Sequence, residues 1–154
     1  MTDQPSGEFL VRMQELLARG EDVHIKPGGI SMLPLFRPNE DIIILSPLPE
    51  KLKKYDIPFY RRSSGKFVLH RIVKVGESYT CIGDNQFHPE PGIAREQMIG
   101  VVTGFIRNDR KHTVNEFGYK LYSRVWHHTR KIRHVFKWPR YYLRRILSWL
   151  KLKP

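Results

Sequence analysis

The sequence predicts a mainly β fold, in which a small antiparallel β domain follows one helix and precedes a basic helical tail. Three observations support this prediction. Apolar residues recur at helical spacing near the N-terminus, short runs rich in β-branched and aromatic residues then alternate with turn-forming segments, and the last part of the chain combines helical spacing with many basic residues. A chain of 154 residues suits one domain with an appendage and can bury a sizeable core.

The first expected element is an amphipathic helix. Ser6-Gly7-Glu8 introduces apolar residues that share one helical face, and Gly20 supplies a stop. The apolar residues are Phe9, Leu10, Met13, Leu16 and Leu17. The simplest interpretation is that this face packs on the core of the domain.

Six strands are expected after the helix, because each run is rich in strand-forming residues and is bounded by turn signals. They are Val23 to Ile25, Ile42 to Leu45, Ile57 to Arg61, Lys66 to Val75, Ser78 to Ile82 and Met98 to Arg107, and Pro89-Glu90-Pro91-Gly92 is expected to be a turn. The segment from Phe59 to Phe67 is expected to form a hairpin that places His70 within a strand among apolar neighbours. Desolvation there would favour the neutral imidazole.

The charge of the chain divides it into two parts. Of the 27 Lys and Arg residues, 16 lie at or before Glu116 together with all 15 Asp and Glu residues, whereas 11 Lys and Arg and no acidic residue follow. The sequence therefore predicts a nearly neutral domain over residues 1–116 and a basic amphipathic helical tail over residues 117–154.

The tail has three possible partners. Leu121, Val125 and Ile132 recur at helical spacing among basic and aromatic residues, which is typical of a helix that lies on an anionic membrane surface. Docking to the domain itself or to a partner protein is the second interpretation, and nucleic acid is the third. Nucleic acid is the least favoured partner because no recognition motif accompanies the charge.

Several classes of protein are disfavoured by what the sequence lacks. One cysteine, Cys81, rules out an internal disulfide framework, and its place in an expected strand suggests a buried apolar residue. No run of about 18 apolar residues is present, and the acidic, polar start does not resemble a secretory signal. No metal or cofactor is expected, because no metal-ligand spacing or phosphate loop occurs. We therefore expect a cytoplasmic protein, with peripheral membrane association as the role of the tail.

Three short segments suggest a serine peptidase. A serine hydroxyl needs a neighbouring base and a group that orients that base, and Ser31, His70 and Asp84 could supply these roles. Gly28 and Gly29 precede the serine, and glycine allows a substrate carbonyl to approach backbone N–H groups that hold an oxyanion.

These segments resemble the signal peptidase I superfamily, which includes the LexA-type self-cleaving repressors. Its Gly-x-Ser-Met-x-Pro segment is matched by Gly29-Ile30-Ser31-Met32-Leu33-Pro34, its basic-residue-Arg segment by His70-Arg71, and its Gly-Asp-Asn segment by Gly83-Asp84-Asn85. Histidine before arginine resembles the branch that uses histidine as base. The resemblance implies a LexA-like β fold and a serine endopeptidase that cleaves an extended peptide, such as a leader or signal-type precursor, after a small residue. Ser31 would be the nucleophile, His70 the base and Asp84 its orienter, while Gly29, Ile30, Met32 and Pro34 would contact the substrate.

The chain departs from the family pattern at three places. Pro-Gly-Asp is replaced by Pro38-Asn39-Glu40-Asp41, which keeps the aspartate but lengthens the turn by one residue. Gly-Asp is replaced by Tyr55-Asp56, which keeps only the aspartate. Gly29 stands where some members carry a hydroxyl side chain that helps to bind the oxyanion. Asp56 is the alternative third member of the site if Asp84 is displaced, and Arg71 is expected to pair with a carboxylate or carbonyl in a structural role.

Two other functions compete with a precursor peptidase. One is a LexA-type switch that cleaves itself or a partner, and the other is a membrane-binding adaptor that keeps the fold without the chemistry. Lys66 or Lys74 is the alternative base, because the wider family uses lysine.

Overall fold

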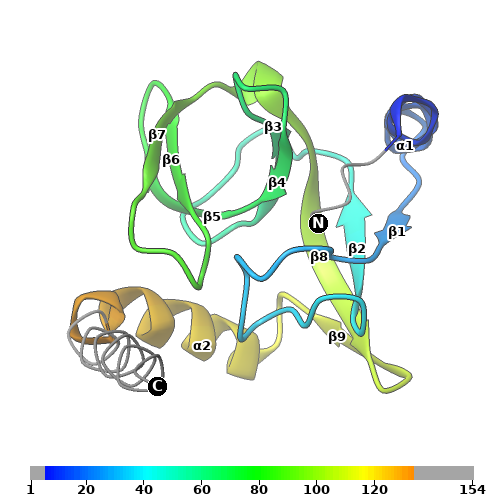
Figure 1. Cartoon of the computed structure of the whole chain (residues 1–154). Helices are drawn as coiled ribbons and strands as arrows, with labels where there is room; N and C mark the ends of the chain where they lie inside the picture. Colours follow the sequence, from blue (N-terminus) through cyan, green and yellow to red (C-terminus); the bar gives the residue numbers. More distant parts are fainter. Residues whose placement is uncertain (1–5, 134–154) are drawn as a thin grey trace, which may run out of the picture.

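The structure is a computed structural model that describes residues 6–133 and shows a mainly antiparallel β protein with two sheets and two α-helices (Figure 1). The first helix, α1 (Gly7–Ala18), begins where the Ser6 hydroxyl accepts a hydrogen bond from the Phe9 N–H. Met13 and Leu17 on its inner face are buried in the core, as expected. The predicted N-terminal helix is therefore confirmed.

The larger sheet has six strands in the order β1-β2-β8-β3-β4, with β9 paired to β8. These strands are β1 (Val23–Ile25), β2 (Ile42–Ser46), β3 (Pro58–Arg61), β4 (Phe67–Leu69), β8 (Met98–Arg107) and β9 (Arg110–Thr113). Figure 1 shows β8 as a long strand with α1, β1 and β2 on one side and the other strands, except its partner β9, on the other. This strand joins the two halves of the body.

The smaller sheet is formed by β5 (Arg71–Val75), β6 (Tyr79–Ile82) and β7 (Glu90–Ile93), in that order. The predicted strand from Lys66 to Val75 is therefore two strands. The chain leaves the larger sheet after Leu69 and enters the smaller one at Arg71, so His70 lies at the point of transfer. The expectation that His70 lies within a continuous strand is wrong, although its burial is confirmed.

Two strands were not expected from the sequence. The predicted turn at Pro89–Gly92 lies mostly in β7, which is an edge strand paired with β6. Proline has no backbone N–H to donate, and an edge strand tolerates Pro91 because no second neighbouring strand requires that hydrogen bond. β9 pairs with β8 after a turn in which Asn108 and Asp109 both have positive φ, at 49° and 60°. Such turns favour Asn and Asp and match the twist of a hairpin.

The buried apolar residues form two clusters. The first lies between α1 and the larger sheet and includes Met13, Leu17 and Phe36. The second includes Tyr60 and Cys81 and lies among the strands that connect the two sheets. Burial raises the pKa of the Cys81 thiol to about 12, so this residue is an apolar core residue, as the sequence suggested.

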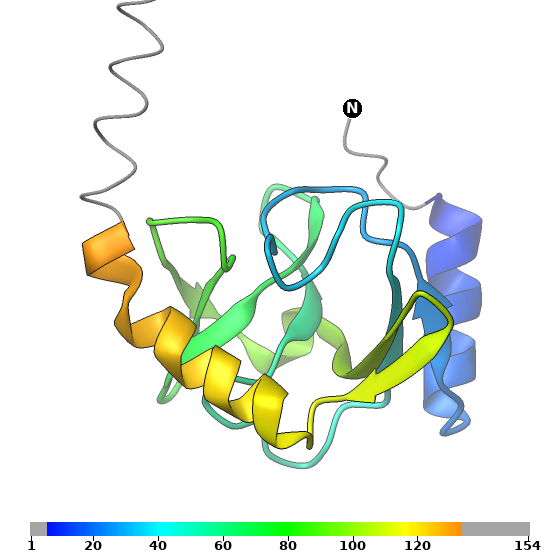
Figure 2. The same cartoon turned by 90° about the horizontal axis from the view of Figure 1, so that it is seen from below.

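The second helix, α2 (Phe117–His128), packs along the body (Figure 2). Tyr119 and Tyr122 contact the first core cluster, and Ser123 is buried. The inner face of α2 therefore packs on residues that precede Glu116. No helix within residues 6–133 is long and apolar enough to span a bilayer. Residues 134–154 of the predicted tail lie outside the described part of the chain.

Candidate active site

Ser31 lies in the loop that joins β1 to β2, and a second loop holds it in place. The backbone N–H of Asn85 donates to the Ser31 carbonyl at 2.8 Å, and the Asn85 side-chain amide donates to the Ile30 carbonyl at 3.2 Å. Two of the three predicted segments, the serine segment and the Gly-Asp-Asn segment, are thus in direct contact.

Gly83 explains why the second segment begins with glycine. A Cβ atom at this position would lie 2.6 Å from the Ser31 carbonyl oxygen, far closer than van der Waals contact allows. Any other side chain would push the serine loop away. Glycine is therefore required for the close approach of the two loops.

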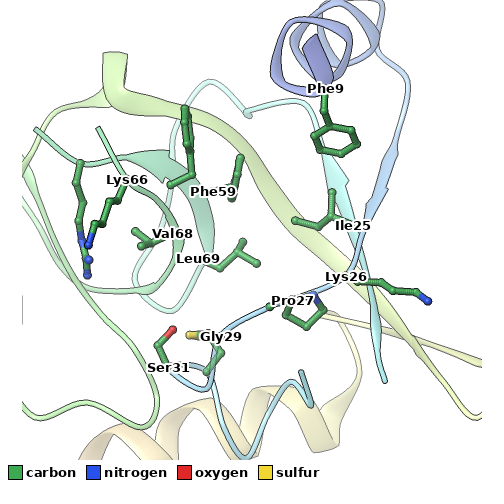
Figure 3. Close-up of a pocket in the computed structure, with 14 residues that line it drawn as sticks. Phe9, Ile25, Lys26, Pro27, Gly29, Ser31, Phe59, Lys66, Val68 and Leu69 are labelled. Atoms are coloured by element: carbon green, nitrogen blue, oxygen red, sulfur yellow. The ribbon is translucent and has the colours of Figure 1, made fainter. Parts of the chain in front are cut away.

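The Ser31 hydroxyl points into a mostly apolar cavity of about 480 Å³ (Figure 3). Gly29 and Met32 line it beside Ser31, and Val68 and Leu69 of β4 line it from across. Of the four residues predicted to contact substrate, Gly29 and Met32 lie in this cavity wall, whereas Ile30 and Pro34 do not and are exposed. Arg62 and Lys66 place positive charge at one side.

His70 is completely buried. Its Nδ1 atom lies 3.3 Å from the Tyr60 hydroxyl and 3.3 Å from Glu90 Oε1, while Nε2 has no hydrogen-bond partner in the part of the chain that the structure describes. Burial lowers the pKa of His70 to about 4, and the nearby charge of Glu90 only partly opposes this. The ring is therefore neutral at pH 7, and with a proton on Nδ1 it has an unused acceptor at Nε2.

Glu90 is the carboxylate that contacts His70. Its Oε2 accepts hydrogen bonds from Tyr60 Oη at 2.9 Å and from Arg62 Nε at 2.8 Å, and Arg62 Nη2 contacts Oε1. Burial would raise the pKa of Glu90, but the hydrogen bonds from Arg62 and Tyr60 outweigh it, so the pKa is lowered and the carboxylate is ionised. Sequence reasoning missed Glu90 because it lies in a proline-rich stretch that was expected to be a turn.

Asp84 makes a different pair from the one predicted. Its two carboxylate oxygens accept from Arg71 Nε and Nη2, each at 2.8 Å, and Oδ2 also accepts from Tyr122 Oη at 3.1 Å. Arg71 in turn donates to the Tyr55 carbonyl and to Ser123 Oγ. Asp84 is therefore committed to Arg71 and α2, and the expected structural role of Arg71 is confirmed.

The alternative residues also have defined places. The Asp56 carboxylate accepts from the Lys53 N–H at 2.7 Å, and its carbonyl accepts from the Ile72 N–H, so Asp56 belongs to a turn. Lys66 lines the cavity, whereas Lys74 is exposed on β5 and does not.

A short series of contacts connects the two candidate catalytic residues. Ser31 is bonded to Asn85, the adjacent Asp84 is paired with Arg71, and Arg71 follows His70 in the chain. His70 Nε2 nevertheless has no partner among residues 6–133, so this conformation contains no hydrogen bond from the serine hydroxyl to the ring. No group of His, Cys, Asp and Glu side chains in the same residues is arranged to hold a metal ion.

Comparison with protein-family models, curated proteins and solved structures finds no match for this chain. Any assignment of function consequently depends on the residues and the geometry described above.

Proposed function

We propose that this chain is a serine endopeptidase of the signal peptidase and LexA-like type, with Ser31 as nucleophile and His70 as base. One observation carries the proposal. Ser31 lies at the wall of an apolar cavity, in a loop whose backbone is bonded to the Gly83–Asn85 turn, and His70, which directly follows the cavity-lining Leu69, is a buried neutral ring whose Nε2 has no hydrogen-bond partner within residues 6–133. A buried polar atom without a partner is uncommon in a purely structural residue.

The position of the cavity favours an extended peptide as substrate. β4 is an edge strand of the larger sheet, and its residues Phe67, Val68 and Leu69 all line the cavity that contains Ser31. A peptide in extended conformation can add to such an edge through backbone hydrogen bonds and place alternate side chains in the apolar wall. The scissile carbonyl would then approach Ser31.

The chemistry follows from the protonation state of the site. His70 Nε2 takes the proton of Ser31 Oγ as the oxygen attacks the carbonyl, and backbone N–H groups beside Gly28 and Gly29 hold the resulting oxyanion. The imidazolium, with Glu90 at Nδ1, returns the proton to the leaving amine, and water then hydrolyses the acyl-enzyme by the same path. Substrate binding must bring the serine hydroxyl into hydrogen-bond distance of Nε2, as apo sites often require.

The departures from the family pattern support the same fold. Asn39 and Tyr55 stand where the family has glycine before aspartate, and both adopt positive φ, at 61° and 82°. Glycine is the residue that normally occupies this backbone region. The loops thus have the conformation that the family sequence would favour, although the glycines themselves are absent.

Labelling with a serine-directed phosphonate probe tests the proposal. We expect labelling at Ser31 and its loss in Ser31→Ala, with peptide turnover lowered by roughly 10^3-fold or more in Ser31→Ala and in His70→Ala. The double variant should be little worse than either single one, because the two residues act as a unit. Ser64→Ala, in the exposed turn between β3 and β4, is the control. Additive losses, or a probe bound elsewhere, would contradict the proposal.

A catalytically silent protein is the second candidate, favoured by the missing bond between Ser31 and His70. Absence of probe labelling in the folded protein, with intact α1 and α2, would support that alternative. A mass measurement after incubation would separately reveal a self-cleaving switch, which would lose a defined fragment in the parent chain but not in Ser31→Ala.

A further inference from the structure

The outward face of α2 carries a continuous row of exposed apolar side chains. Phe117, Leu121 and Val125 have exposed fractions of 79%, 48% and 50%. They are four residues apart, so on the helix they share one face. We call these three residues the α2 ridge. Contiguous exposed apolar surface of this kind marks an interaction site.

The opposite face of the same helix is already occupied. Ser123 accepts a hydrogen bond from Arg71, Tyr122 donates to Asp84, and Trp126 Nε1 donates to the Asp84 carbonyl at 2.8 Å. These bonds fix the rotation of α2 on the body. The ridge is therefore held facing away from the core, because rotation of the helix about its axis would break these hydrogen bonds to Arg71 and Asp84.

Basic side chains lie along one side of the ridge. Lys120 and Arg124 lie in the wall of a second cavity, of about 470 Å³, whose other wall includes Lys51, Lys53 and Lys54 from the loop before β3. Figure 2 shows this loop below the body and close to α2. Asp56 is the one carboxylate in the lining, and it already accepts from the Lys53 backbone. The surface is therefore apolar along the α2 ridge and cationic beside it, at Lys120 and Arg124.

We propose that the α2 ridge docks on an anionic lipid bilayer, with the helix axis in the headgroup plane and the Lys120–Arg124 cavity facing lipid phosphates. An apolar face flanked by Lys and Arg is the pattern of such helices, and each cation near the surface adds to the attraction. Residues 117–154 contain no Asp or Glu, so this part of the chain adds no acidic side chain to the cationic surface. This inference does not depend on the peptidase chemistry.

A fluorescent label on the ridge tests the docking directly in the full-length protein. Leu121→Cys would carry an environment-sensitive fluorophore, and Val11→Cys on the exposed face of α1 would be the matched control; the native Cys81 is buried and should not react. We expect a blue shift and higher intensity at position 121 when vesicles of phosphatidylcholine and phosphatidylglycerol are added, with no change at position 11. Vesicles of phosphatidylcholine alone should have little effect.

Three outcomes would overturn the proposal. Binding of the protein to anionic vesicles without a change at position 121 would show that other residues dock. A label that is already shielded before vesicles are added would show that another part of the chain, or a second copy, covers the ridge. Equal responses to neutral and anionic vesicles would remove the role assigned to the cations.

Substitution of the basic residues beside the ridge tests their contribution to binding separately. Lys120→Gln together with Arg124→Gln should weaken binding to the anionic vesicles by roughly 25-fold, about fivefold for each charge. Arg110→Gln with Lys111→Gln on exposed β9 removes the same net charge at a distance from the ridge. Equal losses in both pairs would mean that only total charge matters, which would contradict docking through this face.

Discussion

His70 and Arg71 are neighbours in sequence, yet they have opposite relations to their surroundings. Arg71 is buried with its guanidinium bonded to both oxygens of Asp84, to the Tyr55 carbonyl and to Ser123. His70 is also buried, but only Nδ1 has neighbours, Glu90 and Tyr60, and Nε2 has none among the described residues. At the junction between the two sheets, Arg71 is thus paired with Asp84, and His70 with Glu90.

The difference suggests which pair stabilises the fold and which pair could perform chemistry. A buried charge whose three nitrogens all donate to neighbouring groups is costly to disturb and has little capacity left for a substrate. A neutral ring with a free acceptor can take up a proton. We therefore expect substitutions of the Arg71–Asp84 pair to affect folding and substitutions of the His70–Glu90 pair to affect turnover.

Among substitutions that distinguish the two pairs, the largest expected effect on activity comes from Glu90→Gln. The amide keeps the shape of the side chain but removes the negative charge beside Nδ1, so turnover of an extended peptide should fall by roughly 10^2- to 10^4-fold, as for other orienting carboxylates. Unfolding in urea should change little by comparison. Glu96→Gln, an exposed carboxylate in the 3-10 turn before β8, is the control. Full activity in Glu90→Gln would show that Glu90 does not assist His70.

Asp84→Asn should instead reduce the free energy of unfolding by about 3–5 kcal/mol, because Arg71 keeps its buried charge without a counterion. The measurement is urea unfolding followed by tryptophan fluorescence, to which Trp126 contributes; its indole N–H donates to the Asp84 carbonyl. Asp109→Asn, in the exposed turn before β9, is the matched control and should be nearly neutral. A fully stable Asp84→Asn variant with lost turnover would reverse the two roles and restore Asp84 as the orienter.

The pH dependence of turnover distinguishes the base. His70 can accept a proton only when neutral, and burial lowers its pKa from the ordinary 6.5 to about 4. Activity should therefore be flat through neutral pH and fall as the pH decreases through about 4, by about tenfold per unit below it. Because the charge of Glu90 raises the pKa of His70, the fall should move to lower pH in Glu90→Gln. A rate that still rises above pH 9 would point to a lysine such as Lys66.

The sequence predicted most of the fold because its signals are local. The spacing of Met13 and Leu17 identified the first helix, and six runs of strand-forming residues coincide with strands in the structure. The strands β7 and β9 and the break at His70 were not predicted, since local propensity does not show which neighbouring strand a segment pairs with or to which sheet it belongs. Proline at positions 89 and 91 indicates a turn locally, whereas the edge position of β7 makes it acceptable.

The candidate site was only partly predictable for a related reason. Motif spacing selected Ser31, His70 and the Gly83–Asn85 segment, and the structure brings the first and third into contact. Spacing alone could not decide which carboxylate faces the imidazole, because this depends on how the chain passes from one sheet to the other at residue 70. Nor could it show that α2 supplies Tyr122 and Ser123 to the Arg71–Asp84 pair.

The smallest expected effect tests the contact between Gly83, which precedes Asp84, and the loop that carries Ser31. In Gly83→Ala the new methyl group would lie 2.6 Å from the Ser31 carbonyl oxygen, so the serine loop must move. We expect a loss of stability of about 1–3 kcal/mol, typical of overpacking, and slower labelling of Ser31 by the serine-directed probe. Gly76→Ala, whose methyl group would meet the Ser78 carbonyl at an ordinary 3.6 Å, is the matched control and should leave both quantities nearly unchanged. Slower labelling in Gly83→Ala with unchanged stability would show that the turn only positions the serine. Lost stability with unchanged labelling would show that the loop relaxes without moving the hydroxyl, and the turn would then have no part in the site.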